Sequence, residues 1–437
     1  MFRIAPYVRR VDFRRVRNAA LRLALKTGRR LARGALLRYV KAAPRAQDAA
    51  DGEPRIYFLL YTAWGMGGTI RAVLNLADHL AERHPVTILS VRRTSDQPFF
   101  PFPPGVEVET LDDRGRPPKV PHALRRVLLN ARSSVLADPA DHVAAEFTVW
   151  GELRLARRLR RRTGFLIGTR PGLNILAAEL APPGMVLVGQ DNMNLTAYSE
   201  ALRERMLRFY PGLDAVVLLT ERDRSSYRER FDGRARLEQI PNAARDMGPE
   251  RADLDAKVVI SAGRLTSQKG YDLLIGAFEQ LVTGHPDWRL RIFGAGPGRA
   301  RLKRMIKQRG LAGAVMLAPP AADLGAEMER ASVYALSSRF EGMPLVLLEA
   351  MSKGMAIVAT DCPTGPAELI EDHRNGLLVP TEDVDALAGG LRELMEDAEL
   401  RRRCAAAAVE TARGYGIATV GERWQALLDE LWATRAT

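Results

Sequence analysis

Two glutamates eight residues apart stand in the most informative segment of the sequence. Glu341 ends a short polar stretch, and Glu349 lies in an apolar run that begins after Pro344. Pro344 suits the first position of a helix, whose free N–H groups can bind phosphate. A rise of about 1.5 Å per helical residue places Glu349 up to about 12 Å beyond Glu341. The two carboxylates can therefore contact a sugar and a ribose with a diphosphate between them. The alternative is an acidic cap followed by a solvated glutamate.

Two cations lie in a loop bounded by glycines. Arg264 and Lys269 stand five residues apart between Gly263 and Gly270, directly after an apolar run that predicts a strand. A guanidinium fork and an ammonium group at this spacing suit a diphosphate. The same segment, taken alone, also fits an ordinary surface loop.

A glycine-rich turn, Phe-Gly-Ala-Gly-Pro-Gly, occupies residues 293–298. It differs from the dinucleotide-binding pattern G-x-G-x-x-G because Arg299 stands where the third glycine is needed. No acidic residue ends the next predicted strand, residues 314–317, to bind a ribose. We therefore exclude a nicotinamide site, and we expect the backbone at Gly294 and Gly296 to approach a ligand closely.

The elements that position these segments alternate between strand and helix patterns. Strands are predicted at 55–61, 86–91, 164–168, 185–188 and 215–219 and, in a second series, at 257–262, 288–293, 314–317, 333–337 and 356–359. Such alternation is typical of doubly wound α/β domains with parallel sheets. We assign residues 51–250, completed by 415–437, to an N-terminal Rossmann-like domain and residues 251–414 to a C-terminal one. Ligands bind beyond the carboxyl ends of such strands, so we expect a cleft between the domains.

The positive charge of the chain is concentrated at its N-terminus. The net charge is +13, and residues 1–50 contribute +12 of it, with fourteen Lys and Arg against Asp12 and Asp48. Apolar residues interleave with these arginines, which suits an anionic membrane surface, where each basic residue contributes about 1 kcal/mol. The alternatives are a solvated basic arm and nucleic-acid binding. The near absence of aromatic stacking residues counts against nucleic acid as a partner.

Composition excludes further classes of protein. The two cysteines, Cys362 and Cys404, exclude a disulfide framework and fit a reducing cytoplasm. No run of about 18 apolar residues occurs, so we expect a cytoplasmic protein, soluble or peripheral on the inner face of the cell membrane. The histidines are scattered, and the Asp-x-Asp strings at 253–255 and 383–385 fit caps or surface positions. We expect no metal and no cofactor.

The spacing of these motifs resembles that of the retaining glycosyltransferases of family 4, which have the GT-B fold. The resemblance rests on Glu341-x7-Glu349, the loop from Gly263 to Gly270 and the turn at 293–298, and it covers about residues 55–435. The segment 361–366, Asp-Cys-Pro-Thr-Gly-Pro, is similar to the subgroup that builds bacterial surface polysaccharides and glycosylates teichoic-acid-type polymers. The resemblance also implies a last helix that crosses back to the N-terminal domain.

The resemblance implies a nucleotide-sugar donor, which we expect to be a UDP-sugar, and a glycan, lipid-linked or polymer acceptor. Arg264 and Lys269 would bind the diphosphate, Glu341 the donor sugar and Glu349 the nucleotide ribose. Retention would proceed by front-face attack, in which the leaving phosphate assists removal of the acceptor proton. The expected donor-binding residues are Gly67, Gly68, Arg264, Lys269, Gly294, Gly296, Glu341, Gly342, Met343, Leu345 and Glu349.

One position departs from the family pattern. Many members have a histidine in the N-terminal domain near the reacting sugar, and the matching stretch here, residues 189–194, has Asn192 at that position. Asparagine cannot act as a base, but it can hydrogen-bond a sugar hydroxyl. We expect Glu341, Asp191 and Asn192 to form the catalytic group. A shifted role for Asp191, a weaker enzyme and a plain loop all stay open.

Two other classes of function fit the same sequence. A sugar-nucleotide epimerase on this fold would need acid and base residues between the domains, and it would act without an acceptor. A membrane- or nucleic-acid-binding protein with a degenerate transferase site would bind but not catalyse. The Asn192 substitution keeps this second alternative open, whereas the complete set of C-terminal motifs counts against it.

Overall fold

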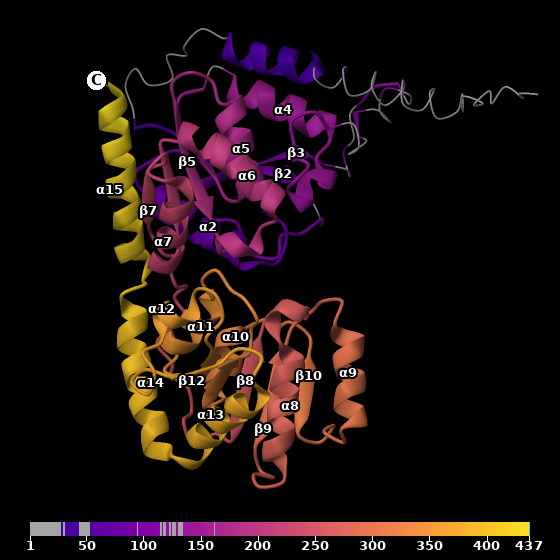
Figure 1. The fold of residues 1–437 in the computed structure, drawn as a ribbon, viewed down its shortest axis with the longest axis vertical. Coiled ribbons are helices and arrows are strands. Elements are labelled where there is room, and N and C mark those ends of the chain that lie inside the picture. The colour runs from indigo at the N-terminus through magenta and orange to yellow at the C-terminus, as the bar shows by residue number, and fades with distance from the viewer. Residues whose placement is uncertain are drawn as a thin grey trace, which may run out of the picture.

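The computed structural model describes residues 28, 31–42, 53–93, 95–113, 116, 119–121, 124, 128–129, 134–160 and 162–436. They form two α/β domains, shown one above the other in Figure 1. Most of the basic segment 1–50 lies outside the described residues. Within the part of the chain that is described, no helix combines the length and apolarity needed to cross a bilayer.

The N-terminal domain is built on a parallel sheet with the strand order β3-β2-β1-β4-β5-β6-β7. The helices flank the sheet, so the inner strands are covered and read as continuous apolar runs. The strands are β1 (Ile56–Leu60), β2 (Val86–Arg92), β3 (Val106–Asp112), β4 (Gly164–Gly168), β5 (Met185–Asp191), β6 (Ala215–Leu218) and β7 (Leu237–Gln239). The helices are α2 (Gly68–Leu80), α4 (Val149–Leu159), α5 (Pro171–Leu180), α6 (Glu200–Phe209) and α7 (Glu221–Phe231).

The C-terminal domain repeats this plan with the strand order β10-β9-β8-β11-β12-β13, again parallel. Both sheets change direction of winding beside their first strand, β1 or β8, which is where doubly wound sheets bind ligands. The strands are β8 (Val258–Ala262), β9 (Arg289–Phe293), β10 (Val315–Ala318), β11 (Val333–Leu336), β12 (Ala356–Thr360) and β13 (Leu377–Val379). The helices are α8 (Tyr271–Val282), α9 (Arg299–Gln308), α10 (Leu324–Glu329), α11 (Leu345–Ser352), α12 (Pro366–Leu369), α13 (Val384–Glu396) and α14 (Ala398–Arg413).

The predicted pair of Rossmann-like domains is confirmed, but three strands are missing from the predicted set. These are β3, β7 and β13, and each lies at the edge of its sheet. An edge strand is partly exposed, so its sequence lacks a continuous apolar run. β3 alternates Val and Glu, and β7 and β13 contain only three residues each, too few for periodicity to be recognised.

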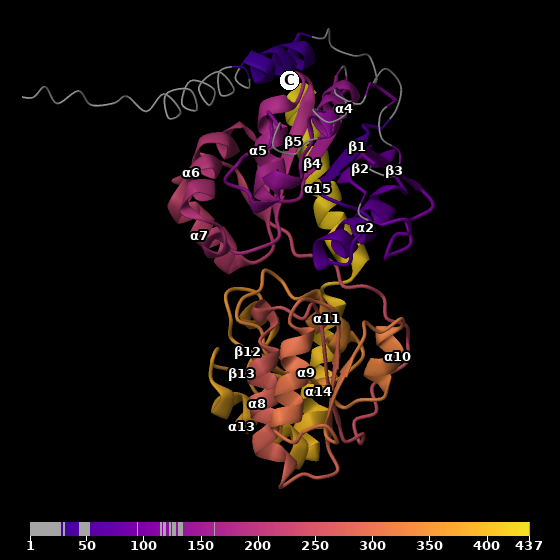
Figure 2. The same ribbon diagram turned by 90° about the vertical axis from the view of Figure 1, so that its right-hand side faces the viewer.

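The last helix, α15 (Ile417–Ala436), leaves the C-terminal domain and packs against α2 and β5 of the N-terminal domain. Figure 1 and Figure 2 together show α15 along one side of the upper domain, while α14 stays with the lower one. Trp424 of α15 is 1% exposed and belongs to the same apolar cluster as Phe58 of β1. The crossing runs beside the first connection between the domains, where Ala244 N donates to Tyr415 O over 2.7 Å. The predicted return of the last helix is confirmed.

Part of the basic segment belongs to the N-terminal domain. Residues 31–41 are helical and lie above α4 and α5 in Figure 1. Leu36 and Val40 join the apolar cluster that includes Leu155 of α4. Arg33 pairs with Glu179 and donates to two backbone carbonyl oxygens, over 2.7 and 3.0 Å. This stretch is therefore docked on the domain rather than separate from it.

We predict that Trp424→Ala destabilises the protein by about 3–5 kcal/mol, because it removes the largest buried side chain of the returning helix and leaves a cavity. Urea unfolding measures the change in the free energy of unfolding. Glu422→Ala on the exposed side of α15 is the matched control, with an expected change below about 0.5 kcal/mol. Equal effects of the two substitutions would mean that α15 does not support the N-terminal domain.

Candidate active site

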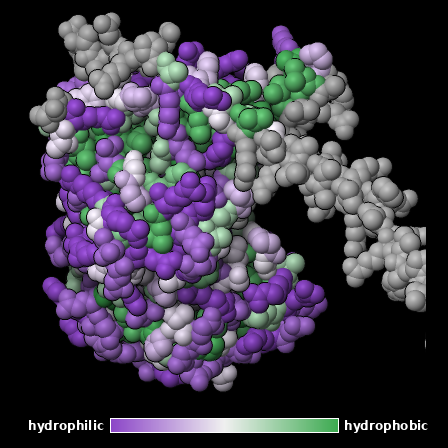
Figure 3. Space-filling model, turned by 45° about the horizontal axis from the view of Figure 1, so that its top comes forward, coloured by the Kyte–Doolittle hydropathy of each residue, from purple (hydrophilic) through white to green (hydrophobic). Residues whose placement is uncertain are grey.

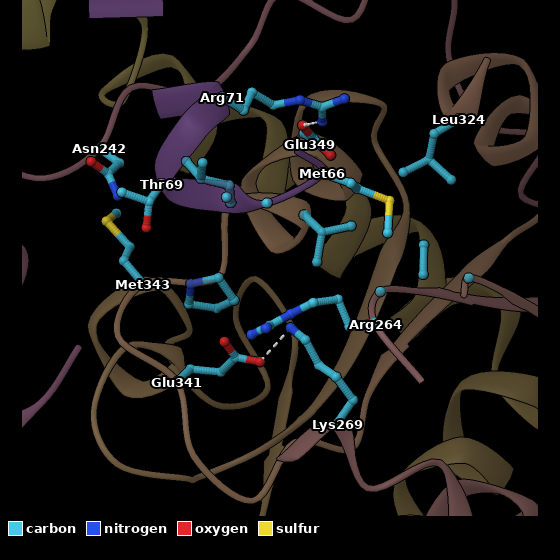
Figure 4. Close-up of a pocket in the computed structure, with 18 of the residues that line it drawn as sticks. Met66, Thr69, Arg71, Asn242, Arg264, Lys269, Leu324, Glu341, Met343 and Glu349 are labelled. Carbon is cyan, nitrogen blue, oxygen red and sulfur yellow. Dashed lines mark hydrogen bonds and ion pairs between the residues drawn. The ribbon is translucent and has the colours of Figure 1, made fainter. Parts of the chain in front are cut away.

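A cavity of about 260 Å³ lies between the two domains. Its walls come from the turn after β1, the loops after β8 and β9, and the start of α11, so it sits beyond the carboxyl ends of strands as expected. Figure 4 shows the side chains that point into it. Most of the predicted site residues line this cavity: Gly67, Gly68, Asn192, Arg264, Lys269, Gly294, Glu341, Gly342, Met343, Leu345 and Glu349.

Lys269 and Glu341 meet at one wall of the cavity. Lys269 Nζ lies 2.6 Å from Glu341 Oε1, and Ser338 Oγ donates to the same oxygen over 2.6 Å. The two loops can approach because Gly270 has φ of 59° and a Cβ there would overlap the carbonyl oxygen of Ser337. Glycine is therefore required at the end of the Lys269 loop.

Arg264 completes a cationic wall with Lys269. One Nη of Arg264 donates to Gln268 Oε1 over 3.2 Å, and Gln268 Nε2 donates to Phe340 O over 3.0 Å, which ties the loop to the neighbouring one. In Figure 4 the ends of both cationic side chains converge near Glu341. The structure thus brings together the two cations predicted to bind diphosphate. Lys269 lies in the short 3-10 helix Ser267–Lys269, and Arg264 lies in the loop before it.

Glu349 lies at the other end of the cavity, on α11, and its side chain is 2% exposed. It forms an ion pair with Arg71, which comes from α2 of the N-terminal domain. Burial raises the pKa of Glu349 above the ordinary glutamate value, and the Arg71 charge opposes that rise. Pro344 is the residue that precedes α11 rather than its first residue, and no side chain caps this helix end. Sequence analysis missed Arg71, although it stands three residues after the predicted Gly67-Gly68 loop.

Asn192 lines the cavity, whereas its neighbour Asp191 does not. The Asn192 amide donates to Thr169 O and accepts from Asn242 Nδ2, each over 3.2 Å. Asp191 is 1% exposed and accepts hydrogen bonds from Tyr227, over 2.6 Å, and Tyr210 as well as from Asn174. The structure therefore places Asp191 in the interior of the N-terminal domain, behind the cavity wall. Burial raises the pKa of Asp191 to about 7.

The glycines of the 293–298 turn serve chain packing. A Cβ at Gly294 would overlap the carbonyl oxygen of Gly263, and one at Gly296 would lie 2.7 Å from Leu265 O. Gly294 still lines the cavity, but Gly296 does not. The tight contact of both glycines is with the loop that carries Arg264, and the expected approach of this backbone to a ligand stays a prediction.

Backbone and side-chain contacts between the domains hold the two halves of the site together. A Cβ at Gly342 would overlap the carbonyl oxygen of Asn192, so this glycine permits the domains to touch. Asn194 Nδ2 donates to Glu341 O and Pro363 O over 3.2 and 3.1 Å. Sequence analysis missed Asn194, whose role depends on a residue 147 positions away.

Neither Asp-x-Asp string lies in the cavity. Asp383 caps α13 by accepting from Ala386 N over 2.8 Å, and Asp253 accepts from Asp255 N over 3.0 Å. Among the described residues, no three or more His, Cys, Asp or Glu side chains lie together as a metal site would require. The cap and surface roles predicted for these aspartates agree with this geometry.

Comparison with known proteins identifies the C-terminal half of the chain. Residues 243–411 match the family Glycosyl transferases group 1. These residues form a group 1 glycosyltransferase domain. The match contains the loop with Arg264 and Lys269 and both glutamates of the Glu341-x7-Glu349 motif. The prediction of a glycosyltransferase is thereby confirmed for this domain.

Two curated relatives resemble the chain over most of its length. The exopolysaccharide phosphotransferase SCO2592 of Streptomyces coelicolor is 37% identical over 87% of this chain, which spans 41% of that protein. An uncharacterized glycosyltransferase of Haemophilus influenzae is 26% identical over 86% of this chain and 99% of its own length. The first relative thus contains much sequence that this chain does not match.

A solved structure confirms the architecture around the glycosyltransferase domain. S. aureus TarM, crystallised as a mutant with fondaparinux, alpha-GlcNAc-glycerol and UDP, superimposes with a TM-score of 0.69 at 15% identity. The match covers 86% of this chain and 100% of TarM. The predicted GT-B fold is confirmed. At this identity the likeness concerns the fold alone.

We predict that Asp191 makes stability depend on pH. Its folded-state pKa, about 7, lies above the ordinary value of 3.8, so the folded state binds more protons between those values and unfolding becomes easier as pH rises through them. The slope is at most about 1.4 kcal/mol per pH unit. Asp191→Asn should remove it, so that the variant loses less stability than the wild type between about pH 5 and pH 8.

Urea unfolding at both pH values measures this difference. Asp78→Asn on the exposed side of α2 is the control, and it should keep the wild-type dependence on pH. An unchanged slope in Asp191→Asn would show that Asp191 is ionised in the folded protein throughout this range.

Proposed function

We propose that the protein is a retaining, metal-independent glycosyltransferase that moves a hexose or N-acetylhexosamine from a nucleotide sugar, a UDP-sugar, to a cell-envelope glycan. The observation that carries the proposal is the arrangement of one cavity between two Rossmann-like domains. Glu341 stands at one end of that cavity, Glu349 at the other, and Arg264 and Lys269 converge on its wall. UDP in the TarM complex supports the choice of nucleotide.

In this mechanism the chain aligns the reactants and stabilises the leaving group. The bond between the anomeric carbon and the diphosphate oxygen breaks while the acceptor oxygen bonds to the same face of that carbon. The acceptor proton passes to the leaving diphosphate, so no side chain needs to act as a base. Arg264, Lys269 and the uncapped start of α11 stabilise the negative charge that develops on the diphosphate.

Glu341 and Asn192 orient the sugar in this proposal. Glu341 keeps a carboxylate oxygen, Oε2, for sugar hydroxyls while Oε1 is bound by Lys269 and Ser338. Asn192 offers an amide rather than a base, and its own hydrogen bonds to Thr169 O and Asn242 hold it against the wall. Asp191, buried behind this wall, takes no part in the reaction.

The acceptor is proposed to be a glycan polymer or a lipid-linked glycan that enters from the N-terminal domain. SCO2592 is named for exopolysaccharide, and the TarM complex contains alpha-GlcNAc-glycerol. Phe99 lines the cavity and is 48% exposed, so an apolar surface is available there for a sugar ring. Figure 3 shows patches of hydrophobic residues among hydrophilic ones over the upper, N-terminal domain.

One observation favours a second candidate, transfer of a sugar phosphate. The 37% identical relative is named a phosphotransferase, although the chain spans only 41% of it. The two reactions differ in the bond that breaks. Sugar transfer from a UDP-sugar releases UDP, whereas sugar-phosphate transfer releases UMP, so the identity of the released nucleotide distinguishes them.

We predict that one UDP-sugar in a panel of UDP-, GDP- and ADP-sugars binds and is slowly hydrolysed with release of UDP, also in the presence of EDTA. Glu349→Ala should weaken nucleotide binding by about tenfold or more, because hydrogen bonds to a charged partner contribute about 1.5–3 kcal/mol. Calorimetry and nucleotide chromatography provide the measurements. Glu250→Ala, at an exposed position outside the cavity, is the control.

The outcomes separate the candidates. Release of UMP would support phosphotransfer, and a changed sugar without acceptor or released nucleotide would support the epimerase alternative. No binding of any nucleotide sugar at millimolar concentration would refute a functional donor site and favour a binding protein.

We also propose that residues 1–50 place the enzyme on the inner face of the cell membrane. Leu31 and Tyr39 of the docked helix are 66% and 41% exposed, and the preceding residues supply most of the positive charge. We predict that the full chain floats with anionic liposomes and that a variant lacking residues 1–27 does not. Neutral liposomes provide the control. Equal flotation of the two proteins would remove the basis of this proposal.

A further inference from the structure

Arg71 reaches from the N-terminal domain into the site of the C-terminal domain. It lies in the first turn of α2, where its N–H donates to Gly67 O over 3.1 Å. Its guanidinium pairs with Oε1 of Glu349, and its Cζ lies 4.7 Å from the ring centroid of Phe100. The carboxylate on one side and the aromatic ring on the other fix the guanidinium in one place.

Glu349 depends on this arginine for its charge. A buried carboxylate without a partner takes up a proton or destabilises the fold. The groups that face it are Arg71 on α2, Arg245 in the connection between the domains and Tyr334 on β11. Within the described part of the chain, Arg71 is the one side chain that hydrogen-bonds the carboxylate. Burial is already the largest influence on the pKa of Glu349, and loss of Arg71 would leave only the Arg245 charge to oppose it.

The ion pair leaves half of the carboxylate available. Arg71 binds Oε1, and no described residue hydrogen-bonds Oε2, while the Glu349 side chain lines the cavity. Figure 4 shows the second oxygen turned away from the dashed bond to Arg71. The geometry therefore presents one acceptor oxygen of fixed orientation to the cavity.

We infer that Arg71 is a positioning residue of the nucleotide site, which keeps Glu349 ionised and aimed so that Oε2 accepts from the donor ribose. This inference rests on the proposed function, since it assigns the ribose to Glu349. The inference also makes the proposed ribose site depend on the N-terminal domain. Arg71 lies in the first turn of α2, directly after the Gly67-Gly68 loop. A Cβ at Gly68 would lie 3.9 Å from Leu345 of α11, so that loop already touches the other wall.

The test is UDP binding measured by calorimetry from about pH 6.5 to pH 9 for wild type and Arg71→Met. At pH 7 the variant should bind UDP about tenfold or more weakly, because loss of the Arg71 charge raises the pKa of Glu349 further and favours its protonated form. The ratio of the two affinities should approach one as the pH rises and Glu349 ionises. Titration of UDP itself affects both proteins equally and cancels in this ratio. A structural defect alone would lower affinity without this dependence on pH.

Three further variants sharpen the test. Arg71→Lys keeps a charge and should restore part of the affinity. Arg222→Met removes another arginine that faces the C-terminal domain, with Nη1 3.9 Å from Asp361, and should change affinity by less than about twofold. In a Glu349→Gln background, Arg71→Met should also change affinity by less than about twofold. The Glu349 charge through which Arg71 acts is already absent from that background.

The inference is overturned if Arg71→Met binds UDP within about twofold of wild type at every pH, or more tightly, which would make Arg71 a competitor for the site. If Arg71→Met does not fold, as judged by thermal unfolding, the same pH series on the uncharged but polar variant Arg71→Gln decides, and a ratio to wild type that does not change with pH contradicts the inference. Failure of the wild type to bind UDP would instead refute the proposed function, so the two failures are distinguishable.

Discussion

The close approach of two loops, one from each domain, is the constraint on which the site depends. Gly342 has no room for a side chain against the carbonyl oxygen of Asn192, and Asn194 bridges the same gap by donating to Glu341 O and Pro363 O. These contacts set the position of Glu341 relative to the N-terminal wall. Because the contacts are made by backbone atoms and one amide, they define distance more strictly than apolar packing would.

Charge within the cavity is arranged around two buried carboxylates, each with one cationic partner. Glu341 is bound by Lys269 of its own domain, whereas Glu349 is bound by Arg71 of the other domain. The ion pair of Glu341 is formed within one domain, but the ion pair of Glu349 requires both domains in contact. Domain separation would therefore break the ion pair of Glu349 and leave its carboxylate without that partner, whereas the Lys269–Glu341 pair would persist.

The two domains are also joined beside the cavity, through α15 and the paired connections at Ala244 and Tyr415. Trp424 anchors α15 in the N-terminal core, so the chain crosses the boundary twice at one place, and a backbone hydrogen bond joins the two crossing segments. Asn242 of the first connection also lines the cavity, so the covalent crossing and the site share one wall.

The sequence by itself determined the fold class, the two alternating domains and most of the predicted residues that line the cavity. Central parallel strands are covered on both faces, so their continuous apolar runs reveal them, and motifs such as Glu341-x7-Glu349 are local in the chain. Only the tertiary structure decided which residues meet across the domains. The Arg71 partner of Glu349, the bridge made by Asn194 and the burial of Asp191 depend on residues far apart in sequence. Periodicity and spacing describe one segment at a time, and such contacts arise when separate segments fold together.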